Sequence, residues 1–264
     1  MKDVFNSILA SFSMFSKIPV RTKSLNWDPN GMRYIMASYP LIGVVIGALM
    51  FAWLYVCGRF SAPPMLRALG ITLLPIAVTG GLHLDGLCDT CDALGANVSP
   101  ERRREILKDP RAGAFGVIGV VTHLLASFAL ACAVEDSLHC TLALCLSFVV
   151  SRTISAMAVV GLPASGDGSA SRFKTNASKA TRVVLYVFLL LCVVAIFLVG
   201  IVENWSLAVA WPIAALAAFL SLERTAKRKF GGMSGDLAGW FLQRCELWQL
   251  TAIVLATWIG GVIA

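Results

Sequence analysis

Two strongly apolar segments are joined by the sequence Thr79-Gly80-Gly81-Leu82-His83-Leu84-Asp85-Gly86-Leu87-Cys88-Asp89-Thr90-Cys91-Asp92-Ala93-Leu94-Gly95. Asp85, Asp89 and Asp92 are spaced i, i+4 and i+7, so in a helix they would share one face within about two turns. At a separation of about 6 Å and an effective dielectric of about 20, each pair of ionised carboxylates repels by roughly 3 kcal/mol. This face therefore requires protonation, a basic partner or a divalent cation.

The residue types of this run favour a Mg²⁺ site. Hard oxygen ligands, completed by a substrate phosphate, form the coordination that Mg²⁺ prefers. His83, Cys88 and Cys91 raise the alternative of zinc or redox chemistry, but the C-x-x-C pair lacks a second pair of ligands. His83 could instead orient a carboxylate or bind phosphate. Three solvated aspartates on a loop are the plainer alternative, which the apolar flanks and the nearby glycines disfavour, since glycine permits close backbone approach.

The composition is that of a polytopic membrane protein. Of 264 residues, 58% are hydrophobic and 14% are charged, and the mean hydropathy is +0.77, which is far outside the range of a soluble domain. A span needs about 20 apolar residues, and by this criterion the sequence predicts one all-α domain, residues 1–264, with seven transmembrane helices. These spans are residues 34–57, 66–82, 113–134, 138–161, 183–202, 205–222 and 248–264.

The basic residues predict the orientation of the chain. Nearly all of the 22 Lys and Arg residues lie in segments between alternate spans, namely 2–33, 102–111, 172–182 and 224–244. Because Lys and Arg accumulate in cytoplasmic loops, the N-terminus and these segments are expected in the cytoplasm. The C-terminus is expected outside, unless the short seventh span is re-entrant. The net charge of +7 is thus mainly a topology signal with some affinity for anionic lipids, and no nucleic-acid-binding pattern accompanies it.

The N-terminal apolar stretch and the cysteines have structural interpretations. Residues 4–15 are short, interrupted by polar residues and without a small-residue cleavage pattern, which predicts an amphipathic helix on the membrane surface rather than a signal peptide. Most of the eight cysteines lie in or beside apolar spans, where cysteine behaves as a small hydrophobic residue. A disulfide framework is therefore not expected.

Four basic side chains are candidates for binding phosphate. Arg111 lies in the turn Asp109-Pro110-Arg111, where a plain turn into the membrane is the alternative. Arg152 lies within a span, about 14 Å of helix from its cytoplasmic end, and would anchor an anionic substrate group or one of the aspartates. Arg172 and Lys174 end a loop of small residues, 161–174, which suits a mobile lid or a solvated linker.

A second acidic, glycine-rich element contains Asp236 within residues 230–239. It is expected on the same membrane face as Asp85, Asp89 and Asp92, and two such elements on one face are hard to explain by packing alone. The active site is therefore expected in the cytoplasmic loops around 83–112, 162–182 and 223–247.

These motifs together resemble the cobalamin synthase family, the adenosylcobinamide-GDP ribazoletransferases. The similarity runs along the whole chain in order, through Phe15-Ser16-Lys17-Ile18-Pro19-Val20, Pro40-Leu41-Ile42-Gly43, His83-Leu84-Asp85-Gly86-Leu87 with Asp89 and Asp92, Asp109-Pro110-Arg111 and Gly231-Gly232-Met233-Ser234-Gly235-Asp236. Cys88 and Cys91 depart from the family pattern, which has small residues such as alanine there. The aspartates are kept.

The resemblance implies a Mg²⁺-dependent enzyme of a bacterial or archaeal cytoplasmic (inner) membrane. It would join adenosylcobinamide-GDP to α-ribazole or α-ribazole 5′-phosphate, giving adenosylcobalamin or its 5′-phosphate and GMP, in the last steps of cobalamin biosynthesis. In this scheme Asp85 and Asp89 hold Mg²⁺, while Asp92 completes the metal site or, with Asp236, accepts the proton of the attacking ribose hydroxyl. His83 is a further catalytic candidate, and the oligomeric state, including a homo-oligomer, is left open.

Three other functions are compatible with parts of the pattern. The spaced aspartates are also similar to those of CDP-alcohol phosphotransferases, although the spacings differ. A secondary transporter would explain the spans, but transporters place their ionisable sites near the membrane midplane. A purely structural membrane subunit is the third alternative.

Overall fold

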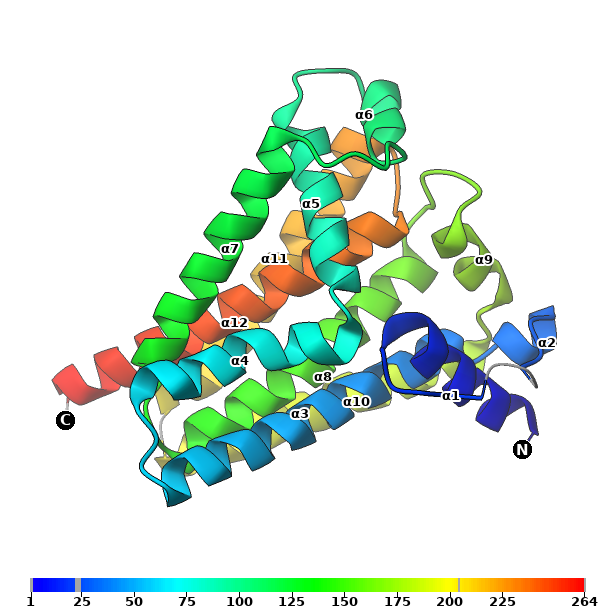
Figure 1. Ribbon diagram of the computed structural model, residues 1–264. Helices are drawn as coiled ribbons and strands as arrows, with labels where there is room; N and C mark the ends of the chain where they lie inside the picture. The colour runs from blue at the N-terminus through cyan, green and yellow to red at the C-terminus, as the bar shows by residue number, and fades with distance from the viewer. Residues whose placement is uncertain (1, 22–24, 204, 264) are drawn as a thin grey trace.

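A computed structural model describes residues 2–21, 25–203 and 205–263, and it shows an all-α protein with no strand in these ranges (Figure 1). The helices are α1 (Lys2–Phe15), α2 (Pro29–Met32), α3 (Ile35–Arg59), α4 (Pro64–Thr79), α5 (Leu82–Gly95), α6 (Pro100–Ile106), α7 (Ala114–Ala133), α8 (Leu138–Gly161), α9 (Ser169–Asn176), α10 (Lys179–Glu203), α11 (Trp205–Thr225), the π-helical turn η2 (Ala226–Phe230) and α12 (Gly235–Ile263). The all-α prediction is confirmed. Lys23 and Ala264, which belong to the first basic segment and the seventh predicted span, lie outside the described residues.

The number of spans differs from the sequence prediction. Five described helices are long and apolar enough to cross a membrane, namely α3, α7, α8, α10 and α11 with η2. The pair α4 and α5, bent by 95°, is a sixth candidate. The predicted seventh span is the later part of α12, a helix of 29 residues that begins at Gly235 and carries Arg244 and Glu246 in its first half. The number of seven spans is therefore not confirmed.

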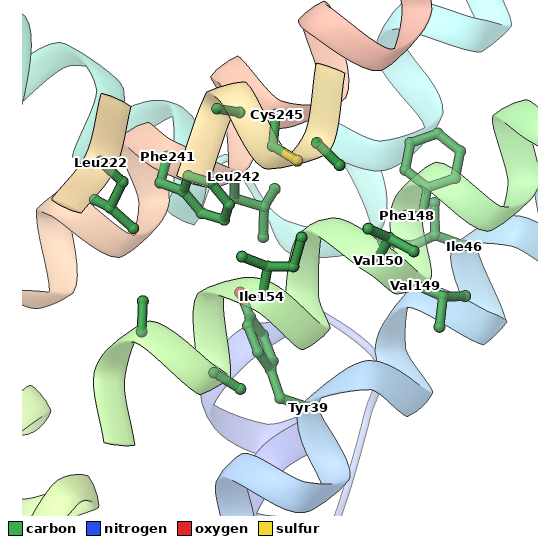
Figure 2. Packing of buried hydrophobic residues seen from close by; sticks show 14 of the residues in the cluster. Tyr39, Ile46, Phe148, Val149, Val150, Ile154, Leu222, Phe241, Leu242 and Cys245 are labelled. Carbon is green, nitrogen blue, oxygen red and sulfur yellow. The ribbon is translucent and has the colours of Figure 1, made fainter. Parts of the chain in front are cut away.

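Helix α8 forms the centre of the bundle and packs on α3, α10 and α12. The backbones of α3 and α8 approach closely at Gly43 and Gly47, because two small residues four positions apart leave room for a neighbouring helix. A Cβ atom on Gly47 would lie 2.9 Å from the carbonyl oxygen of Cys145, and one on Gly43 would collide with the backbone of Phe148. Figure 2 shows apolar side chains of α3, α8 and α12 meeting in the core that results.

The polar segments lie toward one end of the bundle. Helices α1, α2, α6 and α9 are found there, while the C-terminus and the α3–α4 and α7–α8 connections lie at the other end (Figure 1). Contacts of α2 with α9 and of α6 with η2 join the four basic segments in two pairs. This common placement is the one that the distribution of Lys and Arg predicts.

Candidate active site

The acidic run leaves the bundle axis through a two-glycine turn. Helix α4 ends at Gly80, with φ of 65°, and α5 begins after Gly81, with φ of 80°, a backbone conformation that glycine adopts at little cost. The amide of Lys17, just after α1, donates a hydrogen bond of 2.8 Å to the carbonyl of Val78. The surface helix therefore holds the turn in place, and α5 continues at 95° to α4, beyond the span.

A glycine contact brings Asp236 to the acidic face of α5. A Cβ atom on Gly86 would lie 2.7 Å from the carbonyl oxygen of Asp236, and one on Gly239 would lie 3.3 Å from the Cα atom of His83. Only helices without side chains at the crossing can approach this closely. The first turn of α12 therefore packs directly on α5, and two acidic elements far apart in the sequence form one cluster.

The electrostatics of this cluster are those of crowded carboxylates. Burial, and then the negative charges of Asp85, Asp236 and Asp92, raise the pKa of Asp89 from 3.8 to about 6. Burial and the charge of Asp85 also raise the pKa of Asp236. No basic group contributes to either shift. The cluster thus favours a proton or a cation, as the spacing of the aspartates predicts.

Asp92 has a different environment from the other two aspartates of α5. Its carboxylate accepts hydrogen bonds from the amides of Gly113, at 2.6 Å, and Gly116, at 2.8 Å. These amides begin α7, so Asp92 caps that helix from a neighbouring one and compensates the positive end of its dipole. The structure therefore places Asp92 as a cap that fixes α7 against α5.

His83 is buried and contacts Tyr39 of α3. It is 4% exposed, and its Nε2 lies 2.6 Å from the hydroxyl oxygen of Tyr39 on α3. Its Nδ1 has no hydrogen-bond partner among the described residues. The structure thus places this side chain at the junction of α3 and α5, beneath the acidic face.

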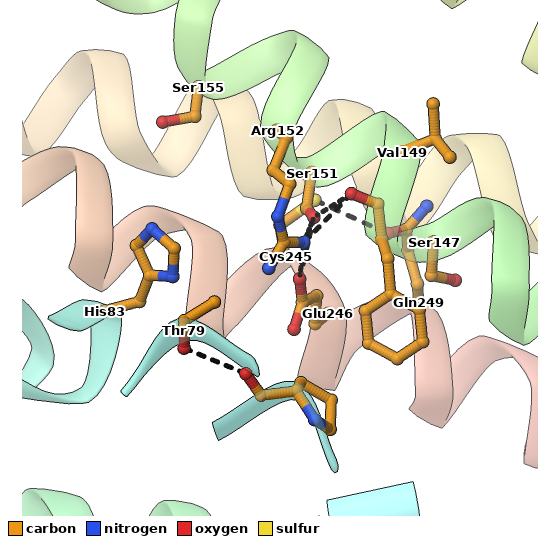
Figure 3. Close-up of polar contacts among 12 residues, drawn as sticks. Thr79, His83, Ser147, Val149, Ser151, Arg152, Ser155, Cys245, Glu246 and Gln249 are labelled. Carbon is orange, nitrogen blue, oxygen red and sulfur yellow. Dashed lines mark hydrogen bonds and ion pairs between the residues drawn. The ribbon is translucent and has the colours of Figure 1, made fainter. Parts of the chain in front are cut away.

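The structure corrects the expected surroundings of Arg152. The side chain is fully buried, and its guanidinium lies 2.7 Å from a carboxylate oxygen of Glu246 on α12. Figure 3 shows Arg152 and Ser151 converging on this carboxylate, with His83 to one side. Arg152 therefore pairs with Glu246 in the core, and not with an aspartate of α5. Sequence reasoning missed Glu246, for which the signal was a single acidic residue next to the seventh apolar run.

The remaining basic candidates lie at the rim. Arg111 is 86% exposed and forms an ion pair of 2.8 Å with Asp109. Lys174 donates a hydrogen bond of 2.8 Å to the carbonyl of Leu162, and Arg172 is exposed. Among the described residues, none of these three side chains forms an ion pair or hydrogen bond with Asp85, Asp89 or Asp236.

The loop expected to be a mobile lid is tethered beside Asp236. The amide of Ser165 donates to the carbonyl of Met233 at 2.9 Å, and the amide of Met233 donates to the carbonyl of Pro163 at 2.7 Å. A Cβ atom on Gly232, whose φ is 156°, would lie 2.5 Å from the backbone of Ala164. The glycine-rich loop before α12 therefore docks on the predicted lid through backbone pairing.

The donor set fits Mg²⁺ better than zinc. Cys88 and Cys91 are free thiols flanking the carboxylates. Within the described ranges, the group of three ligand side chains whose atoms converge within 4.8 Å lies elsewhere, at Glu135, His139 and Cys140 near the other end of the bundle. The carboxylate oxygens of the aspartates are thus farther apart than the ligand atoms of that group. Looser spacing suits Mg²⁺, which is usually held by one or two carboxylates together with water and substrate phosphates.

The fold and the site define a polytopic membrane protein whose polar end carries a crowded carboxylate centre of the kind that serves phosphoryl transfer. The chain belongs to the cobalamin-5-phosphate synthase family, whose model matches residues 7–254. No solved structure matches the chain.

Three relatives illustrate the similarity. All three are named adenosylcobinamide-GDP ribazoletransferase. The protein of Lachnoclostridium phytofermentans is 38% identical to this chain, and the match covers 95% of this chain and 94% of the relative. The protein of Clostridium perfringens strain 13 is 34% identical, over 97% of this chain and 98% of the relative. The protein of Albidiferax ferrireducens is 32% identical, over 94% of this chain and 96% of the relative. The similarity therefore covers nearly the full length of these proteins as well as of this chain.

Proposed function

We propose that this chain joins adenosylcobinamide-GDP to α-ribazole or its 5′-phosphate at the centre formed by Asp85, Asp89 and Asp236, in a Mg²⁺-dependent reaction that releases GMP. The family assignment supports the transfer. The Gly86–Asp236 contact supports this location of the reaction centre, because it joins two acidic segments that are distant in the sequence. The bilayer is the third partner, since five described helices are long and apolar enough to cross a membrane.

The carboxylates have separate roles in this proposal. Asp85 and Asp89 would hold Mg²⁺, which supplies charge neutralisation at the pyrophosphate and at the departing GMP. Asp236 would accept the proton of the attacking ribose hydroxyl, a role that suits a carboxylate whose pKa is raised by burial. The hydroxyl oxygen forms a bond to the phosphorus that carries the cobinamide, and the bond from that phosphorus to GMP breaks. Asp92 positions α7 through its two amide hydrogen bonds.

The rim residues would hold the charged substrates. Arg111, Arg172 and Lys174 belong to segments at the same polar end of the bundle as the cluster, so they could contact phosphate oxygens once the donor is bound. Arg152 is left out of this role because Glu246 already occupies its guanidinium. The excess of basic residues at this end supports a cytoplasmic orientation in a bacterial inner membrane.

The test is release of GMP from adenosylcobinamide-GDP by membranes that contain the full chain, with α-ribazole and Mg²⁺ added. We expect the wild type to form the cobamide and Asp89→Asn to lose product formation. Asp3→Asn, a matched change on the exposed side of α1, should keep it. A fully active Asp89→Asn would overturn the proposed centre. A wild type that consumes CDP-linked donors and not the GDP-linked one would instead favour a CDP-alcohol phosphotransferase.

A further inference from the structure

A partly open cavity adjoins the acidic cluster, and most of its lining lies outside the proposed metal site. Its volume is about 240 Å³, and it is lined by α1, α3, α5, α8, α9 and α12. Asp85 and Asp236 line it together with Phe15, Tyr39, His83 and Phe173. The cavity therefore has an acidic part shared with the proposed reaction centre and an apolar, aromatic part in the protein.

The aromatic side chains form a connected wall. The ring centroids of Phe15 and Tyr39 are 4.7 Å apart, and those of Phe15 and Phe173 are 5.9 Å apart. The ring of His83 lies 6.1 Å from that of Tyr39. Rings at these separations, set at tilted angles, offer faces and edges on which a further flat ring can pack.

One polar atom in the wall has no partner within the described part of the chain. The contact between Tyr39 and Nε2 of His83 fixes the histidine ring, and Nδ1 is left buried without a hydrogen bond. A buried polar atom without a partner is costly, so native structures rarely keep one. A ligand in the cavity that offers a hydrogen-bonding group to Nδ1 would remove this cost.

The size and polarity of the cavity select between the substrates. At about 240 Å³ it is smaller than the roughly 300–1,000 Å³ of sites for drug-sized ligands, so it admits a bicyclic base and excludes a corrin. Guanine is also bicyclic, but its polar edge would lose hydrogen bonds against Met14, Met36 and Val159. The dimethylbenzimidazole of α-ribazole has no exocyclic polar groups, and its free ring nitrogen can accept one hydrogen bond, as Nδ1 of His83 requires.

We infer that this cavity is the acceptor site, which seats the base of α-ribazole among Phe15, Tyr39 and Phe173 and sets its ribose hydroxyls toward Asp85 and Asp236. The inference rests on the proposed function and names where one of its two substrates binds. It places the ribose beside the group proposed to accept its proton. The donor then approaches from the rim, where Arg111, Arg172 and Lys174 lie.

The test uses Phe173→Ala and Phe173→Leu in the full chain, reconstituted in lipid nanodiscs. Phe197→Ala, at an exposed position of the apolar helix α10, is the matched control. Loss of one stacking ring should raise the KM for α-ribazole about tenfold, with the KM for adenosylcobinamide-GDP unchanged. Phe173→Leu keeps an apolar side chain if Phe173→Ala fails to fold, and it should show the same selective effect.

A direct binding measurement separates this inference from the proposed function. α-Ribazole alone, followed by its own fluorescence, should bind the wild type and the Phe197→Ala control equally and bind Phe173→Leu about tenfold more weakly. Equal binding by all three would overturn the acceptor site even if cobamide is formed. A raised KM for the GDP-linked donor alone would assign the cavity to guanine and overturn it as well. A wild type that binds α-ribazole here but forms no cobamide would contradict the proposed function and leave the binding site standing.

Discussion

Removing the charge of Asp89 should stabilise the metal-free protein and at the same time abolish its response to Mg²⁺. The pKa of Asp89 is raised from 3.8 to about 6, a difference of about two units or about 3 kcal/mol. The side chain is partly exposed, and solvent screening reduces this to about 1 kcal/mol. Because the folded-state pKa lies above the unfolded one, stability falls as pH rises from about 4 to about 6. At pH 7.5 the ionised carboxylate is therefore a net cost, which Asp89→Asn removes.

The assay is thermal unfolding in nanodiscs at pH 7.5, first with a chelator and then with Mg²⁺. For a chain of this size, about 1 kcal/mol corresponds to a rise of about 2–4 °C in Tm for metal-free Asp89→Asn. Mg²⁺ at 100 times its Kd should stabilise the wild type by about 2.7 kcal/mol and so reverse the order. The Asp3→Asn control should follow the wild type in both conditions. A metal-free wild type at least as stable as Asp89→Asn would refute the argument from carboxylate repulsion.

Two further substitutions test the packing that builds the site. Glu246→Ala leaves the guanidinium of Arg152 buried without its partner and should destabilise the protein by about 3–5 kcal/mol. Thermal unfolding measures this loss beside the milder variant Glu246→Gln. An unchanged Tm would show that the ion pair does not contribute to stability. Gly86→Ala places a Cβ atom 2.7 Å from the carbonyl oxygen of Asp236, and the displacement of α12 should lower kcat on the order of 100-fold. Gly166→Ala is the control, because a Cβ atom there meets no atom within 4 Å, and it should remain active. Full activity of Gly86→Ala would show that the close crossing of α5 and α12 is dispensable.

Short-range patterns account for the parts of the protein that the sequence predicts well. The spacing of Asp85, Asp89 and Asp92 indicates a shared face because helical periodicity is a local property. Apolar length predicts the spans α3, α7, α8, α10 and α11 for the same reason. Apolar length does not predict that α12 begins at Gly235, because packing against α5 and α8 stabilises as helix the charged turns that hydropathy would leave in a loop.

The sequence by itself therefore determines the all-α membrane architecture, the gathering of basic residues at one end of the bundle and the presence of crowded carboxylates. Tertiary structure decides which of these groups meet. It pairs Arg152 with Glu246, makes Asp92 a cap for α7, and uses Gly86 and Gly239 to bring Asp236 onto α5. The cavity beneath them is formed by six helices at once. The physical reason is that such contacts depend on the packing of side chains far apart in the chain, which no local periodicity encodes.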